Sequence, residues 1–200
     1  MSRASLATLA IIALALAPVL HAATWTPQPA HSSLIFFVSH FDLAKSSGRF
    51  SRYSGEFDID SKTVESSSAR VVIDVHSLDM GDDKFTETML GKKWFDAEQY
   101  PQMVFQSTSV EPNEDGTATV HGDLQIRDQL IPVELRLERW RCATFPLNGR
   151  YTCGYSLTGE LDRLATGMTR YQKLVGQTIE LRLEFEIERE NVRAGPKRKR

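Results

Sequence analysis

The stretch 120–138, VHGDLQIRDQLIPVELRLE, places an apolar residue at almost every second position. The apolar residues fall on even numbers up to Ile126 and on odd numbers from Ile131, and the polar residues 127–129 separate the two runs. A period of two is that of a β-strand with one buried face, and a change of parity across a short polar segment predicts a hairpin. We therefore expect an antiparallel sheet with one dry face and one wet face.

The same alternation recurs along most of the chain. It predicts further strands at 33–41, 48–60, 70–76, 102–110, 150–162 and 178–188. Together with the hairpin these make about eight strands. The segment 82–95 has helical spacing behind an acidic start, and it predicts a short helix that ends near Gly91, between the third and fourth strands. Long strands, one wet face and one short helix favour an all-β fold, an eight-stranded antiparallel β-barrel, over a sandwich.

The N-terminal segment has the composition of an export signal. Residues 1–23 combine a basic start, an apolar run at 6–20 and the small residues Ala22 and Ala23. The run is too short to span a bilayer comfortably, so it predicts a signal peptide cleaved near Ala22 or Ala23. An uncleaved membrane anchor is the alternative. The rest of the chain is expected to form one domain over 24–190.

Net charge is distributed unevenly along the chain. The tail at 191–200 carries five basic residues and no acidic one. Without this tail and Arg3, the 24 lysines and arginines fall to 18 against 26 acidic residues. A body this acidic is not expected to bind nucleic acid. The tail is expected to be disordered and solvated, and peripheral contact with anionic lipid headgroups is its other interpretation.

The two cysteines predict a disulfide. Cys142 and Cys153 flank the turn-forming residues 146–149. A four-residue loop there would pair Phe145 with Arg150 and would bring the cysteines directly opposite each other, within reach of a disulfide. Closing so short a loop stabilises a fold by about 2–3 kcal/mol. A pair of metal ligands is the competing interpretation, although no other cysteine or histidine is nearby in sequence.

The sequence offers little for catalysis or metal binding. It contains neither G-x-S-x-G nor H-E-x-x-H, so we do not expect an enzyme. The histidines after the signal segment are His31, His40, His76 and His121, and no two have a spacing that would place them together on one element. No metal site and no cofactor are therefore expected.

Several segments, taken in order, resemble the YceI-like proteins. The run HSSLIFFVSH at 31–40 resembles the family's opening H-[ST]-x-V-x-F-x-V-x-H. The later matches are Gly48-Arg49-Phe50 with Gly55 (G-x-F-x-x-x-x-G), Ser77-Leu78-Asp79-Met80-Gly81 (S-I-D-T-G), Trp94-Phe95-Asp96 with Tyr100-Pro101 and Phe105 (F-F-D…Y-P…F), Gly122-Asp123-Leu124 with Pro132-Val133 (G-x-L…P-V), and Arg163 with Gly167-Met168 (R-x-x-x-G-M). The resemblance implies an exported, periplasmic, lipocalin-like barrel that binds a polyisoprenoid as a monomer or homodimer.

Some positions depart from the family pattern. Residues 85–89, FTETM, stand where the family usually has R-D-x-H-L, so charge is replaced by apolar and hydroxyl groups. A ligand headgroup beside this segment would be a less charged one, such as a quinone in preference to a pyrophosphate. Thr166 stands where the family tends to have Phe, and the cysteine hairpin is not part of the general pattern.

The expected function is that of a periplasmic binding or carrier protein, which holds an isoprenoid lipid (a polyprenyl chain or a quinone) in the barrel channel. The inward residues expected to line the channel are Phe36, Val38, Phe50, Val71, Ile73, Phe105, Leu124, Ile126, Val133, Leu135, Tyr155, Leu157, Leu181, Leu183 and Phe185. His40, Tyr155 and Arg163 are the polar groups expected near a headgroup, and Gly122 and Gly159 are expected to leave room in the channel. The alternative is a secreted structural or stress-related interaction domain whose barrel is filled by its own side chains and holds no ligand.

Overall fold

The computed structural model describes residues 25–60 and 62–190, and the segments for which a signal peptide and a basic tail are predicted lie outside them. The strands are β1 (Trp25–Pro27), β2 (Ser33–His40), β3 (Ala44–Phe50), β4 (Tyr53–Asp58), β5 (Ser68–Asp74), β6 (Leu78–Asp79), β7 (Gln102–Pro112), β8 (Ala118–Ile126), β9 (Gln129–Thr144), β10 (Tyr151–Asp162) and β11 (Val175–Arg189). The helices are α1 (Asp83–Leu90) and three short 3₁₀ turns at Pro29–His31, Val64–Ser66 and Val75–Ser77. No described helix is both long enough and apolar enough to cross a membrane.

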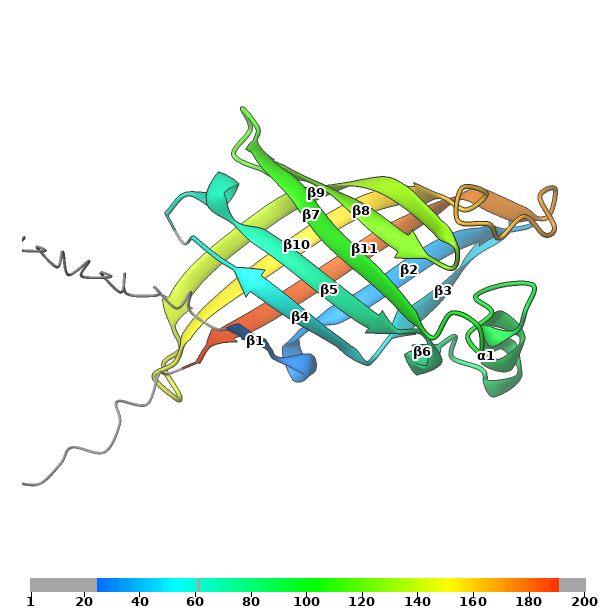
Figure 1. Ribbon diagram of the computed structural model, residues 1–200, viewed down its shortest axis with the longest axis horizontal. Coiled ribbons are helices and arrows are strands. Elements are labelled where there is room, and N and C mark those ends of the chain that lie inside the picture. Colours follow the sequence, from blue (N-terminus) through cyan, green and yellow to red (C-terminus); the bar gives the residue numbers. More distant parts are fainter. Residues whose placement is uncertain (1–24, 61, 191–200) are drawn as a thin grey trace, which may run out of the picture.

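The strands form one sheet in the order β4-β5-β7-β8-β9-β10-β11-β2-β3-β6, with β1 attached to β11, and every pair is antiparallel. The sheet curls around a long axis, and α1 lies at one end of it (Figure 1). This confirms the predicted antiparallel, lipocalin-like architecture, although the described residues form eleven strands and not eight.

The difference in strand number has two sources. β1 and β6 have three and two residues, too few to show an alternating pattern. The predicted strand 48–60 is two strands, because the chain bends at Ser51 and Arg52. The Ser51 N–H donates to the Ser77 carbonyl at 3.3 Å, and the Arg52 carbonyl accepts from the Asp74 N–H at 3.0 Å. These bonds to the 3₁₀ turn after β5 stabilise the bend.

The bent segment also closes the barrel. Its first half, β3, pairs with β2, and its second half, β4, pairs with β5, so the chain itself joins the two ends of the sheet. No ladder links β4 to β3 or β6 among the described strands. Buried Trp25 on β1 packs with Phe57 and Ile59, which closes this seam with apolar side chains. The sheet is thus a half-barrel completed by a bend and a seam, where the sequence predicts a fully closed barrel.

The hairpin predicted at 120–138 is confirmed. β8 and β9 are joined by the two residues Arg127 and Asp128, and Ile126 pairs with Gln129. The even-numbered apolar residues of β8 and the odd-numbered ones of β9 are buried on the inner face. The change of parity across the turn therefore keeps both runs on one side of the sheet.

The cysteine hairpin and the helix also form where they are predicted. Cys142 is directly opposite Cys153 in β9 and β10, and the two form a disulfide. α1 begins after Asp82, whose carboxylate caps it by accepting from the Phe85 N–H at 2.8 Å. It ends at Gly91, as expected.

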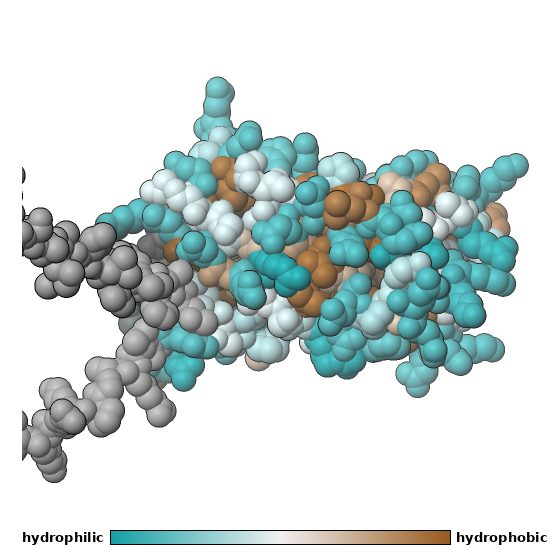
Figure 2. All heavy atoms as spheres, in the orientation of Figure 1, coloured by the Kyte–Doolittle hydropathy of each residue, from teal (hydrophilic) through white to brown (hydrophobic). Residues whose placement is uncertain are grey.

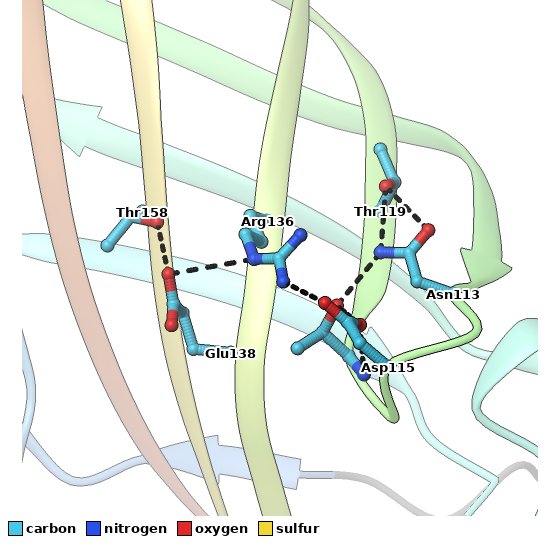
Figure 3. A network of polar contacts seen from close by, with 7 residues as sticks. Asn113, Asp115, Thr119, Arg136, Glu138 and Thr158 are labelled. Atoms are coloured by element: carbon cyan, nitrogen blue, oxygen red, sulfur yellow. Dashed lines mark hydrogen bonds and ion pairs between the residues drawn. The ribbon is translucent and has the colours of Figure 1, made fainter.

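Polar side chains cover most of the outer face, and hydrophobic groups reach the surface over the middle of β5 and β7 (Figure 2). One polar network ties the β7–β8 turn to the neighbouring strands (Figure 3). Asp115 of this turn accepts from Arg136 of β9, and the Thr158 hydroxyl of β10 donates to Glu138 at 2.9 Å. These contacts lie on the wet face, and the inner face is mainly apolar.

Candidate functional site

The inner face of the sheet surrounds a cavity of about 490 Å³. Its wall is almost entirely apolar. The cavity extends from the β2–β3 turn near His40 to the start of β5 near Ser67 and Ser68. Its volume lies within the range of about 300–1,000 Å³ that is typical of ligand pockets. The barrel is therefore not filled by its own side chains, and the predicted alternative of a solid interior is wrong.

The residues predicted from the alternation come together in this wall. They are Phe36, Val38, His40, Phe50, Val71, Ile73, Phe105, Leu124, Ile126, Val133, Leu135, Tyr155, Leu157, Arg163, Leu181, Leu183 and Phe185. Several of them, such as Leu181 and Leu183, pack against the buried core but are only half-buried, because they also border the cavity. Their contact with a ligand remains a prediction.

The inward glycines do not leave open space as predicted. A Cβ on Gly122 would lie 2.5 Å from the ring of Phe105, and a Cβ on Gly159 would lie 2.7 Å from Leu135. The space directly over each glycine is thus occupied by a neighbouring side chain. Gly48 receives the ring of Phe36 in the same way, at 2.5 Å.

The three polar residues predicted near one headgroup do not form a single site. His40 lies exposed at the α1 end of the barrel, with its ring edge-on to Phe41 at 4.5 Å. Tyr155 and Arg163 lie on and just after β10, separated by roughly 26 Å at about 3.3 Å per strand residue. His40 and Arg163 therefore belong to one end of the cavity and Tyr155 to the other.

Arg163 is committed to the protein backbone. Only 2% exposed, it donates from Nε to the Gly176 carbonyl at 2.8 Å and from Nη2 to the Val175 carbonyl at 3.0 Å. Its Nη1 donates to the carbonyls of Met168 and Arg170. Four of its N–H groups are used in this way, and a guanidinium has about five. Burial lowers the pKa of Arg163. Its main role is to hold the loop between β10 and β11, and at most one N–H is not used for this.

Tyr155 lines the cavity toward its other end, and the phenol of Tyr53 lies nearby against Phe185. Burial, and to a smaller extent the nearby Tyr151, raises the pKa of Tyr155, so its hydroxyl stays neutral. The buried hydroxyl of Tyr53 has no hydrogen-bond partner among the described residues. The Tyr53 ring is edge-on to Phe185 at 5.7 Å, and Tyr155 is directly opposite Phe185 on the neighbouring strand.

Part of the wall comes from segments that the alternation could not identify. Met89 and Phe95 enter it from α1 and the segment after it, and Met168, Tyr171 and Leu174 enter it from the β10–β11 loop. The helical spacing locates Met89 on α1, but it does not place α1 against the barrel. The loop has no periodicity, and its one signal in the sequence is the match of Arg163 and Gly167-Met168 to the family pattern.

Metal ligands do not gather in the part of the chain that the structure covers. Within residues 25–60 and 62–190, no three or more His, Cys, Asp or Glu side chains form a group that could hold a metal ion.

A single curled antiparallel sheet around an apolar cavity defines a lipocalin-like barrel. The sequence profile of the YceI-like domain matches residues 25–187. The chain belongs to the YceI-like family. It is 28% identical over 159 residues to a UPF0312 protein of Vibrio cholerae serotype O1, which covers 80% of this chain and 82% of that relative.

Solved structures share the fold at low sequence identity. BcnA of Burkholderia cenocepacia superposes with a TM-score of 0.69 at 23% identity, over 80% of this chain and 98% of BcnA. A polyisoprenoid-binding domain from Saccharophagus degradans, implicated in plant cell wall breakdown, superposes with a TM-score of 0.60 at 16% identity, over 84% of this chain and 99% of that domain.

Proposed function

We propose that this protein is a periplasmic binding or carrier protein that holds an isoprenoid lipid in its barrel. The apolar cavity is the observation that carries the proposal, because an elongated hydrocarbon chain fits a long dry channel. Each buried CH₂-sized group contributes about 0.8 kcal/mol before ordering costs. Membership of the YceI-like family and the polyisoprenoid-binding neighbour support the same ligand class. The periplasmic location rests on the signal peptide predicted for residues 1–23.

The charge of the wall favours a neutral headgroup. Among the described residues that line the cavity, Arg163 alone has a permanent charge, and most of its donors are bound to carbonyls. Phe85, Thr88 and Met89, from the segment that departs from the family pattern, also line the cavity. A pyrophosphate in this cavity would find at most one free N–H and no second cation. A prenylated quinone needs few polar partners, and it is the ligand we favour.

Two measurements test the proposal. Native mass spectrometry of the protein purified from its own host should show a retained prenyl lipid. Titration with a prenylated quinone, a prenyl alcohol and a prenyl pyrophosphate of equal chain length should then give the weakest affinity for the pyrophosphate. A protein that is isolated empty and takes up none of the three would overturn the proposal. Preference for the pyrophosphate would overturn the neutral headgroup alone.

A further inference from the structure

The two ends of the cavity differ in chemistry. Residues that line the cavity and are also exposed mark its openings. At the α1 end these include Phe41, Tyr171 and Leu174, with 49%, 52% and 40% of their surface exposed. At the other end the wall combines Ser67 and Ser68 with Phe57, Ile59 and Val64, none of which is among the exposed large hydrophobic residues of the described chain. The first opening therefore has an apolar edge where a water-facing mouth would have a polar one.

Two loops that are bonded to each other form this apolar edge. Phe41 and Leu43 lie in the β2–β3 turn, and Tyr171 and Leu174 lie in the β10–β11 loop; we call these four residues the rim. The Phe41 N–H donates to the Leu174 carbonyl at 2.7 Å, which ties the two loops together. Trp94 stacks on Tyr171 with 6.2 Å between ring centroids. Leu43 is 88% exposed.

The backbone of the rim is unfavourable for its side chains. Phe41 has a φ of 56° and Tyr171 a φ of 52°, in the left-handed region that bulky residues rarely adopt. Glycine or asparagine would suit both positions better. Local folding therefore does not account for aromatic side chains here, and strained backbone of this kind is concentrated at functional sites.

Cations accompany the apolar rim. The segment 163–175 contains three basic residues and no acidic one, and Arg170 and Lys173 in it are exposed. Lys92 and Lys93 are exposed just before Trp94. The acidic side chains at this end lie mainly on α1 and around it, and the β2–β3 turn has one, Asp42. The β10–β11 loop is thus basic on a body that is acidic overall, and the β2–β3 turn beside it carries the single acidic residue Asp42.

We propose that the rim docks the open end of the barrel onto an anionic lipid bilayer. Its leucines and aromatic rings insert at headgroup depth, and Arg170 and Lys173 lie against lipid phosphates. Exposed aromatic and aliphatic side chains beside basic ones are the composition of membrane-interface surfaces. The inference deepens the proposed function, because a docked mouth lets a lipid enter the cavity without crossing water. β11 ends at the opposite end of the barrel, so that end would point away from the bilayer (Figure 1).

Vesicle sedimentation of the mature, oxidised protein tests this docking. Vesicles of phosphatidylcholine are compared with vesicles that also contain phosphatidylglycerol, at low and high salt. The protein should bind the anionic vesicles, and salt should weaken the binding. Phe41→Asn with Leu43→Ser should reduce the bound fraction several-fold. Asparagine suits the positive φ, so this variant should fold at least as well as the parent.

The chain supplies matched controls at the other end of the barrel. Leu147, in the β9–β10 turn, is 88% exposed like Leu43, and Leu147→Ser should leave vesicle binding unchanged. Lys173→Glu should weaken binding, whereas Lys62→Glu in the β4–β5 connection should not. Equal effects of the rim and control variants, or no binding to anionic vesicles, would overturn the docking. The docking would also be overturned if the parent did not bind vesicles and a rim variant converted a dimer into a monomer. That result would identify the rim as an interface between copies of this chain.

Ligand uptake from detergent micelles separates this inference from the proposed function. Leu43→Ser and Lys173→Glu, at two positions outside the cavity wall, should take up a prenylated quinone from micelles as the parent does. If the parent takes up quinone but does not bind vesicles, only the docking fails. If it binds vesicles but takes up no prenyl probe, only the carrier function fails.

Discussion

Replacing Leu183 with glutamate tests which face of β11 lies against the cavity. Leu183 is directly opposite Leu157 on β10 and Leu34 on β2, in the cavity wall. Glutamate there loses the burial of a leucine and places a carboxylate among apolar side chains, so we expect a loss of about 3–4 kcal/mol in unfolding free energy. Glu184, the next residue, lies on the wet face and accepts from the Ser156 hydroxyl at 2.7 Å. Glu184→Leu should cost about 1 kcal/mol or less.

Urea unfolding measures both changes. With a slope of about 1–3 kcal/mol per molar urea, Leu183→Glu should lower the midpoint by about 1 M or more, and Glu184→Leu should lower it by much less. Similar shifts for the two variants would show that the alternation does not assign the faces of β11, and the reasoning for the whole wall would fail with it.

A third substitution at this position separates folding from binding. Leu183→Trp keeps the side chain apolar and extends it into the open cavity, so the fold should persist while ligand space is lost. Excluding two CH₂-sized groups of a prenyl chain would weaken its binding roughly tenfold. An unchanged dissociation constant for a prenylated quinone, measured by fluorescence titration, would mean that the ligand does not occupy this part of the cavity.

Three further outcomes are expected. Replacing Cys142 and Cys153 together with alanine should lower the unfolding free energy by about 2–3 kcal/mol, and a reducing agent should then have no further effect on the melting temperature. Arg163→Lys should cost about 2–3 kcal/mol, because lysine cannot reach the same set of carbonyls, and amide hydrogen exchange should increase selectively in residues 164–174. Bonds from Thr117 and Arg136 lower the pKa of Asp115 from 3.8 to about 2, so its contribution to stability is present above pH 3.8 and is lost as the pH falls toward 2. Asp115→Asn should remove that part of the pH dependence in acid titrations of the melting temperature.

The inner face could be predicted from the sequence because each strand has only two faces. The alternation of apolar and polar residues within the strand decides which face points inward. In β11, Leu181, Leu183 and Phe185 alternate with Glu180, Arg182 and Glu184, and only one assignment places the charges in water. The cysteine pair could be predicted for a similar reason, since the length of one turn fixes which residues are opposite.

The closure of the barrel could not be predicted in this way. The break at Ser51 and Arg52 depends on hydrogen bonds from residues 74–77, which lie more than twenty positions later in the chain. The position of the β10–β11 loop depends on Arg163, whose four backbone bonds have no signature in the sequence. The separation of Tyr155 from Arg163, by contrast, could have been inferred, since Tyr155 lies in the predicted strand 150–162 and Arg163 directly follows that strand.

The sequence correctly predicted a cavity, but it assigned the glycines the wrong part in forming it. Gly48, Gly122 and Gly159 do not leave holes, because Phe36, Phe105 and Leu135 occupy the space where their side chains would be. A large side chain beside a glycine can lie flat against the sheet. If a larger residue replaced the glycine, the same side chain would extend further toward the barrel axis. The barrel can therefore carry aromatic residues on its inner face, bury much of their surface against glycine and still retain a cavity of about 490 Å³. Gly48 is directly opposite Phe36 and Gly159 is directly opposite Leu135, whereas Phe105 lies diagonally from Gly122, so this packing depends on strand register, which composition alone does not contain.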